Sequence, residues 1–111
     1  MITSAWNNGA HHESGAGYGL RIRSEDRDVH FDRRWMSVRV EIPFDDRTIE
    51  AKVNIAKQSF WNPRCGELIK LEIGRWLISE GHRRWRRGIP PKIELRPIDG
   101  RRFMIMGVIP A

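Results

Sequence analysis

Residues 82–88, HRRWRRG, place four arginines around one tryptophan. An arginine can neutralise one phosphate of a nucleic acid, and a tryptophan ring can stack on an exposed base. The same composition also fits a solvated loop whose tryptophan packs on the core while the arginines reach into water. Nucleic-acid binding is therefore one of two interpretations of Arg83, Arg84, Trp85, Arg86 and Arg87.

A second candidate is the stretch FWNPR at residues 60–64. Asparagine can read adenine and arginine can read guanine through paired hydrogen bonds, so Asn62 and Arg64 are candidate base contacts, with Trp61 beside them. The alternative is that Phe60 and Trp61 are core aromatics and that the Asn-Pro step is only a turn. We expect at least one of the two aromatics in the core.

Residues suited to catalysis or metal binding are present but poorly arranged. The histidines in NNGAHHE, residues 7–13, are adjacent to each other, and adjacent side chains rarely chelate one ion together. Glu50-Ala51-Lys52 has the Glu-X-Lys spelling of metal-dependent nucleases, but it also fits the solvent face of a strand. Cys65 is the one cysteine, so no internal disulfide can form. The pattern favours a protein without catalytic residues, metal or cofactor.

The charge of the chain points to an anionic partner. The 111 residues carry a net charge of +6, and most of the 20 cationic side chains are arginines. Such basicity attracts polyanions, and the planar guanidinium matches phosphate and guanine better than lysine does. We find no signal peptide and no apolar run that could span a membrane, and with a single cysteine this favours the cytoplasm.

The elements that must position these residues are mostly short strands. Residues 1–17 are rich in small and polar types and predict a flexible arm before a single domain over 18–111. Alternation of apolar and polar residues predicts strands over 18–23, 36–42, 48–55, 93–98 and 103–108. Helices are expected from Ser24 to about residue 31 and, from the i, i+4, i+7 spacing, over 68–80. The fold class is α+β, mainly β: an antiparallel pseudobarrel of short strands with two helices.

This order of elements, with Phe60-Trp61-Asn62 before a helix that ends at Gly81, resembles the pseudobarrel of plant B3-type DNA-binding domains. The recognition domains of certain restriction endonucleases share that fold. The resemblance implies two arms that clamp the major groove, one over residues 61–66 and the other near residues 7–23. Arg21 and Arg23 face away from the predicted core in the latter. GAGYGLRI, SFW and GRWL also resemble a group of small uncharacterised bacterial proteins, a likeness that implies no function.

The sequence therefore predicts a non-enzymatic module that binds nucleic acid, most simply double-stranded DNA. Arg21, Arg23, Asn62 and Arg64 would contact the groove, and the 83–87 run would hold the backbone. The alternative is a protein–protein interaction or regulatory domain with Trp61 or Trp85 as the interface anchor. A metal-dependent nuclease using Glu50, Lys52 and an aspartate is less favoured.

Overall fold

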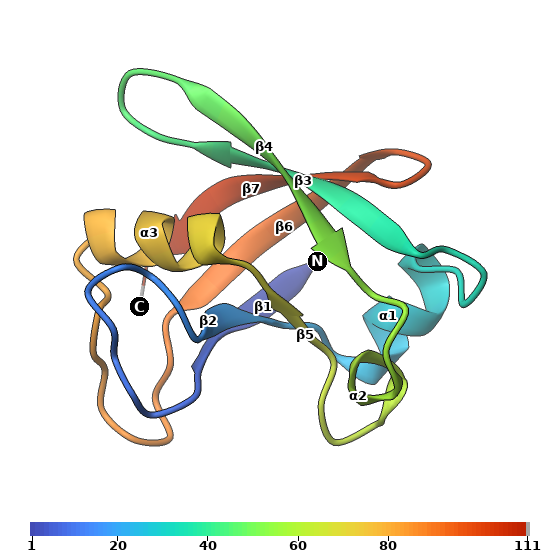
Figure 1. Ribbon diagram of the computed structural model, residues 1–111, viewed down its shortest axis with the longest axis horizontal. Coiled ribbons are helices and arrows are strands. Elements are labelled where there is room, and N and C mark those ends of the chain that lie inside the picture. Colours follow the sequence, from blue (N-terminus) through green and yellow to red (C-terminus); the bar gives the residue numbers. More distant parts are fainter. Residues whose placement is uncertain (111) are drawn as a thin grey trace.

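The computed structural model describes residues 1–110 as a seven-stranded mixed sheet that curls into a nearly closed barrel (Figure 1). The strands are β1 (Ile2–Asn7), β2 (Tyr18–Arg21), β3 (Ser37–Pro43), β4 (Thr48–Asn54), β5 (Glu67–Ile69), β6 (Lys92–Asp99) and β7 (Arg102–Ile109). The helices are α1 (Ser24–His30), α2 (Gln58–Trp61) and α3 (Leu71–Ser79). The strand order is β4-β3-β7-β6-β1-β2-β5, and its two end strands approach each other. Ala111, the last residue of the predicted domain, lies outside the described residues.

The predicted mainly-β barrel is confirmed, but the prediction that it is purely antiparallel is wrong. β3 and β7 run parallel, with Val40 opposite Phe103. β6 and β7 are joined by a tight turn at Asp99-Gly100, which makes that pair antiparallel. No turn joins β3 to β7, so nothing local imposes their relative direction.

The prediction of two helices is also wrong, because a third helix, α2, forms where none is expected, and the expected helix over 68–80 begins only at Leu71. Leu68 and Ile69 belong to β5 instead, where they pair with Leu20 and Gly19 of β2. Pairing with a neighbouring strand overrides the helical spacing of these residues.

The start of the chain differs from the flexible arm predicted over residues 1–17. Residues 2–7 are not an arm but strand β1, which lies between β6 and β2. Thr3 and Ala5 point into the core while Ser4 and Trp6 point outward. The strand therefore alternates between buried and outward residues, but its buried side chains are small and give no strong apolar pattern in the sequence. The Thr3 hydroxyl donates a hydrogen bond of 2.9 Å to the carbonyl oxygen of Ile93.

The loop that follows β1 packs directly on α3. A Cβ atom built on Gly74 would overlap the carbonyl oxygen of Gly15, so this contact requires glycine in the helix. The approach brings the GAGYG and GRWL stretches together and holds the loop of residues 8–17 against the barrel.

The barrel interior is filled by the inward side chains of the strands and closed by the helices. α3 covers one region with Ile73, Trp76 and Leu77, all buried. At the other end Phe31 lies between Phe60 and Phe103, at ring-centroid distances of 5.3 and 4.6 Å. Phe60 is fully buried, which confirms the expected core aromatic. Within residues 1–110, no helix is long and apolar enough to cross a membrane.

Candidate nucleic-acid interface

The basic loop, residues 82–91, leaves α3 after Gly81 and leads into β6. Gly81 has a φ of +84°, the left-handed conformation in which glycine commonly ends a helix. Trp85 is half-buried and packs edge-on against Tyr18, with ring centroids 6.2 Å apart. The loop is thus anchored to the barrel at its tryptophan, and its arginines are presented around that anchor.

Arg83 has an internal role. Its Nε and Nη2 atoms donate hydrogen bonds of 3.1 and 2.9 Å to the carbonyl oxygen of His11, and its Nη1 lies 3.6 Å from a carboxylate oxygen of Glu13. The Tyr18 hydroxyl donates to the carbonyl oxygen of Arg83. These contacts join the basic loop to the β1–β2 loop, so Arg83 positions the region more than it faces a ligand.

Arg84, Arg86 and Arg87 are exposed, and their side chains make no ion pair or hydrogen bond with residues 1–110. The segment 81–92 contains no acidic residue. An unpaired surface guanidinium keeps its full attraction for phosphate, because no carboxylate competes for it. The basic loop therefore presents three unpaired cationic side chains within residues 84–87.

The second predicted region consists of α2 and the turn after it, residues 62–66. The Trp61 ring is half-buried, its Nε1 donates a 3.0 Å hydrogen bond to the Ile55 carbonyl, and the Arg33 guanidinium lies 4.7 Å from the ring. Trp61 is therefore fixed within the protein. The Asn62 Oδ1 accepts a 2.9 Å hydrogen bond from the backbone N–H of Arg64, which shapes the turn.

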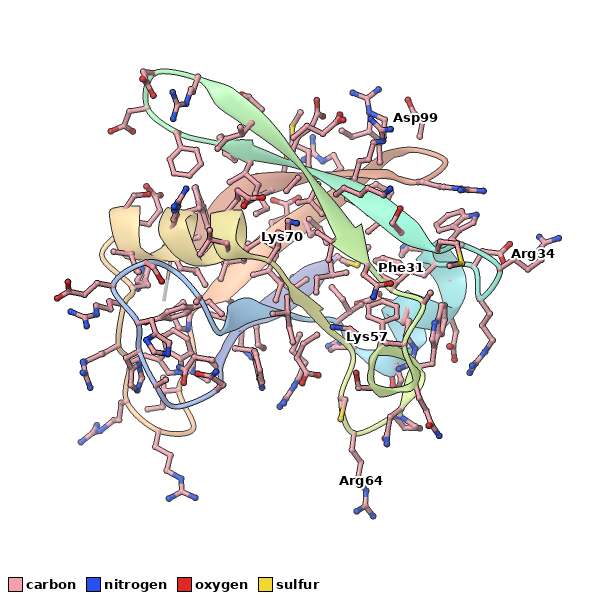
Figure 2. All side chains as sticks on the ribbon, in the orientation of Figure 1. Phe31, Arg34, Lys57, Arg64, Lys70 and Asp99 are labelled. Carbon is pink, nitrogen blue, oxygen red and sulfur yellow. The ribbon has the colours of Figure 1, made fainter. Side chains whose placement is uncertain are left out.

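Arg64 is the side chain of this turn that reaches furthest from the protein, as Figure 2 shows. It is exposed and has no ion pair or side-chain hydrogen bond among residues 1–110. Of the predicted residues in this region, Arg64 is free to contact a ligand. The indole N–H of Trp61 and the side-chain oxygen of Asn62 already have hydrogen-bond partners within the protein.

Arg27 holds this turn in place, a role that its position in the sequence does not indicate. Its side chain is 3% exposed, and Nη1 donates hydrogen bonds of 3.0 and 3.2 Å to the carbonyl oxygens of Phe60 and Asn62. In a short polar helix, an arginine one turn after the start looks like a solvent residue. No signal in the sequence distinguishes it, because its partners lie 33 and 35 residues away.

Between the two regions, the outer face of the sheet carries a row of polar side chains. Lys92, Ser4, Arg21 and Glu67 occupy paired positions across β6, β1, β2 and β5. The Lys92 Nζ donates a 2.7 Å hydrogen bond to Ser4, and the Nε of Arg21 lies 3.7 Å from the Oε2 of Glu67. That carboxylate oxygen is buried and has no hydrogen-bond partner in the described chain.

Arg23 lies past the end of β2. It is less available to bind a ligand than the alternation of apolar and polar residues predicts. Its Nε is 3.7 Å from Asp26 and 3.8 Å from Glu25, at the start of α1. Arg21 and Arg23 thus each face a carboxylate, although both side chains remain about half exposed or more.

The structure brings the predicted regions to one side of the barrel. In Figure 1 the β1–β2 loop and the basic loop lie at one end of the lower side, α2 and its turn lie at the other end, and β1, β2 and β5 lie between them. The longest dimension of the molecule is 34 Å. One turn of B-DNA, about ten base pairs, has a similar length of about 34–36 Å.

The residues of the nuclease alternative, Glu50 and Lys52, lie on β4, and Glu50 is already paired. The Glu50 carboxylate on β4 is 2.8 Å from the Nη1 of Arg39 and 3.8 Å from the Nε of Arg102. Among residues 1–110, no three His, Cys, Asp or Glu side chains are grouped closely enough to hold a metal ion.

Comparison of the chain with family models, with curated proteins and with solved structures found no match. The resemblance to B3-type domains therefore stays a prediction.

Proposed function

We propose that this chain is a non-enzymatic module that binds double-stranded DNA, holding backbone phosphates with the basic loop and reaching the groove with the turn after α2. The observation that carries the proposal is the set of free guanidiniums of Arg84, Arg86 and Arg87 in a segment without a carboxylate. Phosphate contacts release condensed counterions, and this release supplies much of the affinity of proteins for DNA.

Two features favour duplex DNA over a small anion. The free cations of the basic loop and Arg64 belong to separate ends of one side of the barrel, so a single small ligand cannot meet both (Figure 1). The B3-type resemblance is also supported by the order of elements after β1. A strand, a short helix and a hairpin are followed by the aromatic segment, the short strand β5, a helix, a loop and a second hairpin. In that family two arms enter the major groove.

One observation favours a second candidate, a protein–protein interaction domain. A mostly apolar hollow of about 600 Å³ lies beside the basic loop and is lined by Trp85, Ile89, Pro90 and Val108, among others. Ile89 is 63% exposed. An aromatic and aliphatic surface of this kind suits an interface anchor, and binding there would depend little on salt.

Fluorescence anisotropy with a labelled duplex of about 20 base pairs, measured from about 50 to 200 mM salt, tests the proposal. The variant Arg84→Ala/Arg86→Ala/Arg87→Ala should reduce the magnitude of the slope of log K against log salt by about 2.7, since each phosphate contact contributes about 0.9. These three contacts alone account for about a 40-fold loss of affinity over that salt range.

A matched control is Arg47→Ala/Lys52→Ala/Arg101→Ala, which removes the same charge from exposed positions on the β3–β4 hairpin and the β6–β7 turn. It should leave the slope close to that of the wild type. Equal effects of the two variants would show that net charge alone attracts DNA, against a defined site. Failure of the wild type to bind at about 50 mM salt would reject DNA binding and favour the interaction domain.

A further inference from the structure

A hollow of about 780 Å³ lies between the basic loop and the outer face of the sheet. Residues from two strands and two loops line it. They include Trp6 and Asn7 of β1, His11 of the β1–β2 loop, Arg21 of β2, and Trp85 and Arg87 of the basic loop. We call it the tryptophan hollow.

Two indole rings are the first chemical feature of this hollow. Trp6 is half-buried on the outer face of β1, where its partner on β2 is Gly19, a residue with no side chain to cover the ring. Trp85 packs edge-on against Tyr18, whose hydroxyl donates a hydrogen bond to the carbonyl oxygen of Arg83. Nucleobases of every kind stack on aromatic rings, because each has a π face.

The second feature is a hydrogen-bond donor and a hydrogen-bond acceptor, on two residues lining the hollow, that have no partner among residues 1–110. The Asn7 Oδ1 accepts a 2.8 Å hydrogen bond from the backbone of Gly9, while its amide NH₂ has no partner among residues 1–110. The His11 Nδ1 lies 3.3 Å from the Arg83 carbonyl oxygen. A carbonyl only accepts, so in the neutral ring the hydrogen is on Nδ1 and Nε2 keeps a free lone pair.

His11 is also held in an uncommon backbone conformation. Its φ of 52° is the one positive value among the non-glycine residues of the described chain. The two hydrogen bonds from Arg83 to its carbonyl oxygen maintain this conformation. Backbone outliers of this kind often occur where a side chain must be aimed at a ligand.

The third feature is positive charge at the edge of the hollow. Arg87 has no intramolecular partner in residues 1–110, and Arg21 has one carboxylate at 3.7 Å, beyond hydrogen-bond distance. A phosphate alone would use these two cations but leave the tryptophans and the donor and acceptor without a role. A base attached to a phosphate would use all three features.

We propose that the tryptophan hollow receives one unpaired nucleobase of the bound nucleic acid, stacked on Trp6, with its phosphate at Arg87 and Arg21. The base must be unpaired, because in a duplex both its faces and its pairing edge are covered by neighbouring bases. This inference rests on the proposed function and adds a preference to it: the protein binds a duplex with an extruded base more tightly than a fully paired one.

Three labelled duplexes of one sequence test this: fully paired, with one bulged nucleotide, and with a bulged abasic sugar-phosphate. The two bulged probes have the same backbone and differ in the base itself. The wild type should bind the bulged nucleotide about 5- to 100-fold more tightly than the abasic bulge, as expected for the stacking of one base.

The variant Trp6→Leu should bring this ratio close to one, and Trp6→Phe should restore part of it. His11→Gly is a second variant that accepts a positive φ without strain and removes the Nε2 acceptor, so it should lower the ratio severalfold. The matched control is Trp35→Leu, another half-buried tryptophan, next to Arg101 and away from the hollow, which should keep the wild-type ratio. Thermal melts check that each variant is folded.

Equal affinity of the wild type for the two bulged probes, with binding of the paired duplex intact, would overturn the base site and leave the proposed function standing. A preference that persists in folded Trp6→Leu and His11→Gly would place the base elsewhere and also overturn it. Failure to bind any of the three probes would reject the proposed function, and the base site with it.

Discussion

The basic loop and the outer surface of β3, β4 and β7 both carry arginines, but in opposite situations. On the strands, Arg39 lies 2.8 Å from Glu50, and Arg102 lies 3.2 Å from Glu41. We call this the paired surface. In the basic loop, Arg84, Arg86 and Arg87 have no carboxylate partner in residues 1–110.

The difference teaches that arginine content alone does not locate a binding surface. Arg39 and Arg102 occupy neighbouring positions on β3 and β7, and the carboxylate of Glu50 lies within reach of both. An arginine with a carboxylate close by attracts phosphate less than a free one, because the two charges offset each other. Three predictions test this contrast, beginning with the largest effect.

The largest effect is expected from the contact that supports the basic loop. Gly74→Ala places a Cβ against the carbonyl oxygen of Gly15, which is backbone and cannot rotate away. Overpacking of this kind costs about 1–3 kcal/mol, and a backbone oxygen that cannot move away puts this site at the upper end, above the roughly 1 kcal/mol that alanine gains over glycine in a helix. The net loss of about 2 kcal/mol should lower Tm, measured by circular dichroism, by roughly 10 °C.

DNA affinity should fall with it below the melting temperature, because the β1–β2 loop that binds Arg83 is displaced. Ser79→Ala, at the exposed end of the same helix, is the control and should change Tm little. A higher Tm in Gly74→Ala, as helix propensity alone predicts, would contradict the close packing of the loop on α3.

An intermediate effect is expected from removing the carboxylates of the paired surface. Glu41→Gln/Glu50→Gln frees Arg39 and leaves Arg102 with Asp99 as its remaining carboxylate, at 3.5 Å, while keeping the shapes of the side chains. If pairing is what keeps this surface from DNA, the salt slope should steepen by up to about 1.8 and affinity at low salt should rise.

The control is Asp45→Asn/Asp46→Asn, which changes the net charge equally at two exposed residues of the β3–β4 turn and frees no arginine. A steeper slope in the first double variant than in the second would show that pairing decides availability. Identical slopes would mean that the shape of the barrel, and not the ion pairs, keeps DNA away from this surface.

The smallest effect concerns an exposed pair in the loop after α1. Hydrogen bonds from the side chain and backbone of Arg34 lower the pKa of Asp32 from 3.8 to about 2. A carboxyl group with a lowered pKa stabilises the folded state above its unfolded pKa, and this contribution is lost as pH falls from about 4 to 2. The carboxyl is at the surface, so the contribution is small.

The Tm difference between wild type and Asp32→Asn should therefore shrink as pH falls through that range. An NMR titration of the Asp32 carboxyl in the wild type should give a midpoint of about 2. A midpoint near 3.8 would contradict the pairing with Arg34.

Several elements were predictable because their signals are local. The alternation in residues 36–42 and 48–55 predicts the hairpin that forms as β3 and β4, and Val38 pairs with Val53 inside it. α1 begins at Ser24, as expected, but the capping reason is wrong, because Arg23 is the N-cap residue and no side chain caps the helix. The region of the candidate site, with Arg64 and Arg84 among its free cations, was also visible in the sequence as clusters of basic and aromatic residues.

Other parts of the site were not predictable. Trp6 falls in the predicted arm because the strand around it is made of small side chains, and β6, a neighbour of that strand in the sheet, lies about ninety residues away along the chain. Arg27 looks like an ordinary helix-surface residue, yet it is buried and fixes the turn that carries Arg64.

By itself the sequence determined the net charge, most of the strands, the α3 face that covers the core, and the glycine that ends this helix. These follow from properties that each residue or its near neighbours carry. The tertiary structure alone decided that β1 lies inside the sheet, that β3 and β7 run parallel, and which arginines meet a carboxylate. Those outcomes depend on contacts between distant segments, whose geometry exists only once the barrel has formed.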